Sequence, residues 1–151
     1  MENILDDFQE VEPTKEMLRW RQFIGKSANF YIERWIRIEY GDKISFNFAA
    51  FLFGAFWFLY RKMYLEAFIV MIFFAVKPSI TNSFIDENSP LNLLFTIITG
   101  TVLGFTGNLI YYHSAKRKIN RIVAASVSEE TALVSIAKRG GTSKMLSLIH
   151  I

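Results

Sequence analysis

The order of apolar and polar positions divides the chain into an amphipathic beginning, a strongly apolar middle and a mixed end. Near the start, residues 14–24 and 27–40 carry apolar side chains at intervals of three and four, the spacing of helices with one buried face. Gly25 and Gly41 follow these segments and are typical of helix ends. The pattern predicts two consecutive amphipathic helices.

A third amphipathic helix is predicted over residues 126–139. Ser126 and Glu129 have the spacing of a capping box, and Gly140 follows as a helix stop. Because its apolar stripe is narrow, we expect this helix to dock against another surface.

Three apolar stretches fill the middle of the chain. Residues 91–112 are twenty-two residues without a charge, enough to cross the roughly 30 Å hydrocarbon core of a bilayer. Residues 63–76 are fourteen residues with one acid. Residues 46–60 are fifteen uncharged residues with eight aromatic rings, and as a helix they reach only about 22 Å. The predicted class is an all-α integral membrane protein.

The distribution of Lys and Arg orients the membrane segments. Residues 78–90 contain none, whereas residues 113–121 contain four. Since cytoplasmic flanks are rich in basic residues, the end of the span at residue 112 is expected to be cytoplasmic. The chain then crosses outward over residues 61–77 and returns over residues 91–112, which predicts a helical hairpin with both termini inside.

The short aromatic stretch 46–60 has two alternative placements. In the first placement it lies beside the hairpin in the inner membrane interface, or it enters the membrane and returns to the same side with a bend at Gly54. Alternatively, residues 48–76 form one long tilted helix that carries Arg61 and Lys62 into a bundle interior, at an insertion cost of about 3 kcal/mol for each charge at mid-membrane.

This layout assigns residues 1–13 to a disordered acidic tail, residues 14–45 to cytoplasmic amphipathic helices, residues 46–112 to the membrane region and residues 113–151 to a cytoplasmic basic stretch and helix. The start of the chain lacks the features of a cleaved signal peptide, so the anchor is expected to be internal. The side chains expected to anchor at the interface are Trp57, Tyr60, Arg61, Lys62, Tyr64, Lys116, Arg117 and Lys118.

Small residues recur every four positions in the predicted second span, at Thr96, Gly100, Gly104 and Asn108. Such a face lets a neighbouring helix backbone approach closely, and Asn108 can hydrogen-bond across the contact. The partner is either residues 63–76 of the same chain or a second copy of the protein.

Apolar stripes on the amphipathic helices are candidate docking surfaces for a protein partner. They comprise Tyr31, Trp35 and Ile38 in the first part and Leu133 and Ile136 near the end. The first helices fit either the lipid headgroup layer or a helical pair with its own core.

Catalytic and metal-binding patterns are missing from the sequence. There is no cysteine, and His113 and His150 have no carboxylate or histidine at ligand spacing. No nucleophile elbow or phosphate loop occurs, and the basic residues 116–121 at the foot of a span indicate membrane orientation in preference to nucleic-acid binding. We therefore expect no metal, no cofactor, no nucleic-acid partner and no enzymatic activity.

Four stretches resemble a family of small bacterial membrane proteins catalogued as domain of unknown function 2628. They are FIGKSANFYI (23–32), SFNFAAFLFGAFWFLYRKMY (45–64), GNLIYYH (107–113) and GGTS (140–143). Phe48 and Ala55 depart from the family pattern, where Trp and Pro are typical. The resemblance implies a bacterial inner-membrane protein and carries no established activity.

Two functions are consistent with these features. The first is a non-enzymatic interaction or scaffold subunit that sits in the lipid bilayer and binds a protein partner. The alternative is a transport or permeation component, which with two spans per chain requires a homo-oligomer.

Overall fold

The described residues of the computed structural model are 14–42, 45–81, 84–85 and 89–143. They form helices and no strand, which confirms the all-α prediction. The predicted tail 1–13 and the apolar residues 145–151 lie outside this part. In chain order the elements are α1 (Lys15–Ile24), the 3-10 helix η1 (Gly25–Ser27), α2 (Ala28–Glu39), α3 (Phe48–Phe53), α4 (Ala55–Tyr60), α5 (Tyr64–Thr81), α6 (Pro90–Ala125) and α7 (Glu129–Arg139).

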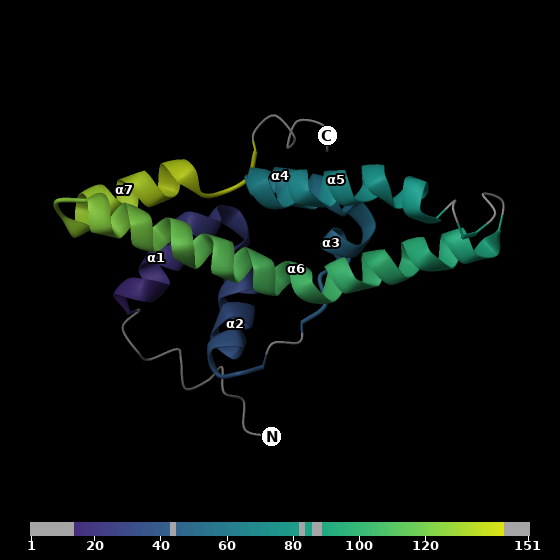
Figure 1. Cartoon of the computed structure of the whole chain (residues 1–151). Helices are drawn as coiled ribbons and strands as arrows, with labels where there is room; N and C mark the ends of the chain where they lie inside the picture. Colours follow the sequence, from purple (N-terminus) through teal and green to yellow (C-terminus); the bar gives the residue numbers. More distant parts are fainter. Residues whose placement is uncertain (1–13, 43–44, 82–83, 86–88, 144–151) are drawn as a thin grey trace, which may run out of the picture.

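Helix α6 runs the length of the molecule and organises the other helices (Figure 1). α1, α2 and α7 pack against its C-terminal half, and α1 also packs against both α2 and α7, so that the first and last helices form one unit. α5 lies beside the N-terminal half of α6, with α3 between them (Figure 1). The molecule therefore has two ends with different surroundings.

At the α1–α2–α7 end, the core is aromatic. Trp35 is completely buried, and its ring stands edge-on to Trp20 at 5.5 Å and to Tyr111 at 5.2 Å between ring centres. Edge-to-face ring pairs add to the gain from burial. The same core includes Phe23, Ile24, Tyr31, Ile38, Trp57, Phe58, Tyr112, Ile119, Ile122 and Ile136.

The other end exposes the apolar residues that a soluble core would bury. α5 and α6 are long and apolar enough to cross a membrane, and in their most apolar stretches only 11% and 22% of the residues are buried. This distinguishes them from core helices of a soluble protein, in which most apolar positions are covered. The exposed residues include Phe48, Leu52, Phe56, Leu65, Phe68, Ile69, Ile72, Phe73, Val76, Leu93, Leu94, Ile98, Val102 and Phe105.

The aromatic stretch 46–60 forms two short helices with a break between them. α3 ends at Gly54, where φ is +49°, and α4 begins directly after it. A second break follows α4, since Lys62 has φ of +56° and α5 begins at Tyr64. The alternative of one helix over residues 48–76 is therefore wrong: glycine tolerates the positive φ that a continuous helix excludes.

Several predicted helix ends are corrected by the structure. α5 continues through Pro78 to Thr81, past the end at residue 77 predicted for the first span, and α6 continues beyond residue 112 to Ala125. The basic residues after 112 are therefore helical. They extend α6 because its C-terminal half is needed to cover α1, α2 and α7.

The last helix begins two residues later than expected. Its cap is Ser128, whose side chain accepts a hydrogen bond from the Thr131 backbone while Thr131 caps Ser128 in return. This box replaces the predicted pair Ser126 and Glu129, since Thr131 stands at the third helical position. Ser126 instead ends α6.

Gly140 follows α7 for a reason that the pattern did not predict. Its φ is −84°, which any residue adopts, but a Cβ atom here would overlap the carbonyl group of Phe23. The next residue, Gly141, has φ of +73° and donates its backbone N–H to the Phe23 oxygen at 2.6 Å. The glycine pair thus joins the end of α7 to the end of α1.

Candidate functional site

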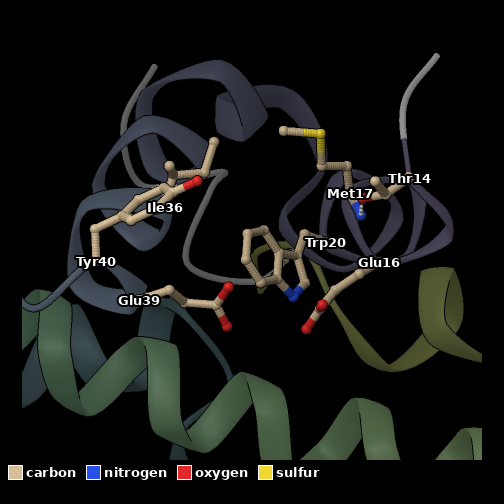
Figure 2. A pocket seen from close by; sticks show the side chains of 7 residues that line it. All are labelled: Thr14, Glu16, Met17, Trp20, Ile36, Glu39 and Tyr40. Atoms are coloured by element: carbon tan, nitrogen blue, oxygen red, sulfur yellow. Dashed lines mark hydrogen bonds between the residues drawn. The ribbon is translucent and has the colours of Figure 1, made fainter. Parts of the chain in front are cut away.

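A pocket of about 420 Å³ opens between α1 and α2 above the C-terminal half of α6 (Figure 2). Its volume lies within the range of small-ligand sites. Its lining residues are Thr14, Glu16, Met17, Trp20, Ile36, Glu39 and Tyr40. The walls are therefore apolar and aromatic, with two carboxylates among them.

The two carboxylates lie on opposite sides of the pocket. Figure 2 shows Glu39 reaching in from α2 and Glu16 from α1, with the Trp20 indole between them. Lys116 of α6 places its Nζ atom 2.6 Å from Glu39 and 3.9 Å from Glu16. An ammonium group of the protein itself thus sits near both carboxylates.

Glu39 is held in the charged form by its neighbours. Burial raises the pKa of this carboxyl group, but hydrogen bonds from Lys116 and from the Tyr112 hydroxyl, both at 2.6 Å, outweigh burial and leave the pKa below its ordinary value. Glu16 has the longer contact to Lys116 as its ion pair among the described residues, and its side chain is half-exposed. The pocket therefore combines one fully paired carboxylate with one weakly paired carboxylate.

No sequence pattern identified Glu16, Glu39 or the pocket. Both glutamates lie on amphipathic helices, whose charged positions are expected from the sequence pattern to face solvent. Their approach depends on the angle at which α1 and α2 meet at η1. A signal was nevertheless present: Trp20 and Tyr40 accompany these acids within the same two segments.

Two predicted interface anchors are inside the protein. Trp57 and Arg61 are 4% and 5% exposed. The Arg61 guanidinium carbon lies 4.4 Å from the ring centre of Tyr31, 5.3 Å from that of Tyr111 and 5.7 Å from that of Tyr60. Arg61 therefore faces aromatic rings of α2, α4 and α6, and its guanidinium is withdrawn from the surface.

The centre of this aromatic core is poor in hydrogen-bond acceptors. Among the described residues, four of its buried polar atoms have no hydrogen-bond partner: Nε and Nη1 of Arg61, Nε1 of Trp35 and the hydroxyl of Tyr111. A buried charge with unpaired donors costs free energy, and the tyrosine faces return part of it.

The other anchors divide between a junction and the surface. Lys62 donates from Nζ to the Gly140 carbonyl at 2.6 Å, and Lys118 donates to the Lys62 carbonyl at 3.0 Å. Tyr60 accepts a backbone hydrogen bond from Ser143 at 2.8 Å. Tyr64 and Arg117 are exposed. The YRKMY and GGTS stretches, which are far apart in the sequence, thus meet at this junction.

The proposed docking stripes are mostly covered. Tyr31, Trp35, Ile38 and Ile136 are buried in the core, and Leu133 is half-buried. This corrects the expectation that they face a partner: the stripes of α2 and α7 are covered by α1 and α6 of the same chain.

The small-residue face of α6 contacts residues 46–51 and not the expected 63–76. A Cβ atom on Gly104 would stand 2.5 Å from the Phe46 ring, and one on Gly100 would stand 3.2 Å from the Phe51 carbonyl oxygen. Asn108 bonds to Asn47 at 2.8 Å. Only the outermost residue, Thr96, meets α5, where its hydroxyl accepts a hydrogen bond from Lys77 at 2.6 Å.

Metal-binding geometry does not occur in the described part of the chain, where no three acidic or histidine side chains gather. A family model described as "Protein of unknown function (DUF2628)" matches residues 10–117, which include α1 to α5 and most of α6. The chain belongs to this family. No curated protein matches the chain. No solved structure matches it. Membership in DUF2628 thus agrees with the resemblance but assigns no activity, so function must be argued from the geometry.

Proposed function

We propose that this DUF2628 protein is a non-enzymatic interaction subunit of a membrane, with one helical end in lipid and the other presented to a protein partner. The observation that carries the proposal is the opposite burial at its two ends. The aromatic core is covered at the α1–α2–α7 end, where exposed apolar side chains such as Leu18, Phe30 and Val134 are scattered, whereas apolar side chains are exposed along α3, α5 and the first half of α6. Water disfavours so large an exposed apolar surface, whereas lipid accepts it.

Hydroxyl groups in the apolar half of α6 support a lipid environment. Thr96, Thr99, Thr101 and Thr106 each donate to the backbone carbonyl four residues earlier, at 2.7 to 2.9 Å. Their polar atoms thus have partners within the helix. This arrangement removes the cost of an unpaired hydroxyl in hydrocarbon.

Packing of the first and last helices on one end of α6 supports an orientation with both termini on one side. Basic residues 116–118 also lie at this end, whereas residues 78–90 carry no Lys or Arg. By the positive-inside rule, the α1–α2–α7 end faces the cytoplasm. We place the protein in a bacterial inner membrane, with residues 46–60 re-entering from the cytoplasmic side.

The role of an interaction subunit is supported by the α1–α2 pocket, which presents apolar walls and carboxylates on the cytoplasmic end. The homo-oligomeric transport alternative has less support. The Gly100 and Gly104 face on which it relied is filled by Phe46 and Phe51 of the same chain.

The layout is tested by cysteine labelling, which is clean because the protein has no native cysteine. The Ser83→Cys variant carries its thiol between the proposed spans, and the Asn120→Cys variant carries it at an exposed position of the cytoplasmic half of α6. In intact spheroplasts, a membrane-impermeant maleimide should label the Ser83→Cys variant alone, and after lysis it should label both variants. Extraction of the protein by alkaline carbonate, or labelling of the Asn120→Cys variant from outside, would contradict the layout.

The interaction role is tested separately by native mass in mild detergent at the natural expression level. We expect a second polypeptide in fixed stoichiometry. A defined homo-oligomer without another polypeptide would instead favour the transport alternative.

A further inference from the structure

We propose that the α1–α2 pocket receives a lysine or arginine side chain of the protein partner. The inference rests on the proposed function, because it names the partner chemistry that the cytoplasmic end recognises. It assigns a role to a pocket that neither the family match nor the sequence pattern identified.

The lining of the pocket matches both parts of a basic side chain. Met17, Trp20, Ile36 and Tyr40 supply apolar and aromatic surface for an alkyl stem. Glu16 lines the same cavity, and within the described ranges its ion pair is the long one to Lys116, at 3.9 Å. Aromatic faces beside carboxylates favour ammonium and guanidinium groups through cation–π and ionic attraction.

Lys116 serves as an internal example of this chemistry. Its ammonium bonds to Glu39 and to the Tyr112 hydroxyl, at 2.6 and 2.8 Å, and lies 5.3 Å from the Tyr112 ring centre. Arg19 also attracts Glu16 electrostatically, but it forms its ion pair with Glu129 at 2.6 Å. One ammonium facing the two pocket carboxylates therefore leaves one negative charge in excess. A second cation therefore completes the charge balance of the pocket.

The residues that precede α1 in the sequence are acidic. The first thirteen residues hold five acids and no Lys or Arg, and they join the structure at Thr14, which lines the pocket. Like charge disfavours this acidic segment as an occupant, and acidic residues attract a basic partner surface over a distance of about 10 Å at moderate salt. A protein partner with several basic residues can bind both the pocket and the acidic residues 1–13, whereas a small free amine binds the pocket alone.

The first test follows the ¹⁵N-indole NMR signals of the three tryptophans in the full-length protein, held in neutral nanodiscs. The probes are the N-acetyl methylamides of lysine, arginine and norleucine. We expect lysine or arginine to shift the signal of Trp20, which lines the pocket, with millimolar affinity, and to leave Trp57 unchanged. Absence of a Trp20 shift with both basic probes, or an equal shift with norleucine, overturns the proposal.

Substitutions of charged residues test whether the pocket carboxylates bind the cationic probe. Glu16→Gln should weaken binding of the lysine probe at least threefold. Lys116→Met removes the internal competitor for Glu39 and should strengthen binding severalfold. Glu33→Gln is the matched control, because Glu33 lies on α2 outside the pocket lining and pairs with Arg37. If all three variants bind the probe equally, the carboxylates do not recognise the cation.

A hexalysine peptide tests the choice of a protein partner. It should bind more tightly than the single-lysine probe, and deletion of residues 2–12 should reduce only this additional affinity. If deletion instead strengthens single-lysine binding severalfold, the tail is the occupant; if hexalysine has no advantage, a small amine is favoured. Either result overturns the inference, whereas the proposed membrane layout is judged independently by the cysteine labelling.

Discussion

Asn47 donates a hydrogen bond from Nδ2 to Oδ1 of Asn108 over 2.8 Å, although 61 positions separate them in the chain. Both side chains are buried. Asn47 also accepts from the Ala50 backbone and so caps α3, while Asn108 donates to the Ser45 side chain at 2.6 Å. The pair therefore fixes the start of α3 against α6.

Asn108→Ala should destabilise the protein by about 1–3 kcal/mol, because it leaves the buried Asn47 amide without its acceptor. Thermal unfolding followed by near-UV circular dichroism measures the loss. Asn120→Ala, an exposed change on the same helix, should have no effect. An equal effect of the two substitutions would mean that the buried amide pair does not stabilise the fold.

Gly104→Leu should displace α3 from α6 and lower stability by about 2 kcal/mol, since the added side chain overlaps Phe46 and Phe51. The matched change is Val102→Leu, which enlarges an exposed position two residues away. Native mass should stay unchanged in both variants. A change of mass in Gly104→Leu without loss of stability would show that this face joins two copies.

Gly140→Ala should cost about 1–3 kcal/mol, because its Cβ atom overlaps the backbone of Phe23 and separates α7 from α1. Trypsin should then cleave faster at the exposed Lys138 and Arg139. Gly141→Ala provides the comparison: its Cβ meets no atom within 4 Å, and its positive φ alone costs about 1 kcal/mol. Equal cleavage rates in the two variants would contradict the steric explanation.

Arg61→Met should raise the melting temperature. The substitution keeps an unbranched apolar stem and removes a buried charge whose desolvation costs several kcal/mol, more than the roughly 2 kcal/mol of a buried cation–π contact. Arg34→Met is the control, because Arg34 also covers a ring, that of Phe30 at 3.5 Å, but reaches solvent. A clear loss of stability in Arg61→Met would mean that the contacts of the guanidinium with the tyrosine rings outweigh the cost of burying its charge.

Acid should weaken the docking of α1, α2 and α7. Hydrogen bonds from Arg19 lower the pKa of Glu129 below its ordinary value of 4.5, and those from Lys116 and Tyr112 outweigh the effect of burial on the pKa of Glu39. Groups with a lowered folded-state pKa stabilise the protein above the unfolded value, and this stability is lost as pH falls through the folded value. As the pH is lowered below about 4.5, the melting temperature should therefore decrease.

The two carboxylates can be separated by substitution. Glu129→Gln and Glu39→Gln should each flatten part of the acid-dependent decrease in melting temperature, and the double variant should flatten more of it. Glu130→Gln, an exposed neighbour of Glu129, should leave the profile unchanged. If the glutamine variants keep the full decrease, other carboxyl groups cause it.

Much of the local structure follows from the sequence because helices form from near neighbours. The spacing of apolar residues predicted α1 and α2, and Gly25 and Gly41 end them as expected, each with a positive φ. Gly54 also marked the bend in residues 46–60. Exact ends were less predictable, because α5 passes Pro78 and α6 continues to Ala125 under the influence of contacts with distant helices.

The sequence by itself determined the helical class, the position of the apolar middle and the breaks at glycine, since each depends on composition, periodicity or a single backbone angle. Only the tertiary structure decided which helices pair their apolar faces with each other. It buried Tyr31, Trp35 and Ile136 in the chain's own core. It also filled the Gly104 face with Phe46 and brought Glu16 near Glu39. The physical reason is that side-chain periodicity identifies a face to be covered, whereas its partner is selected by shape and charge across long sequence separations.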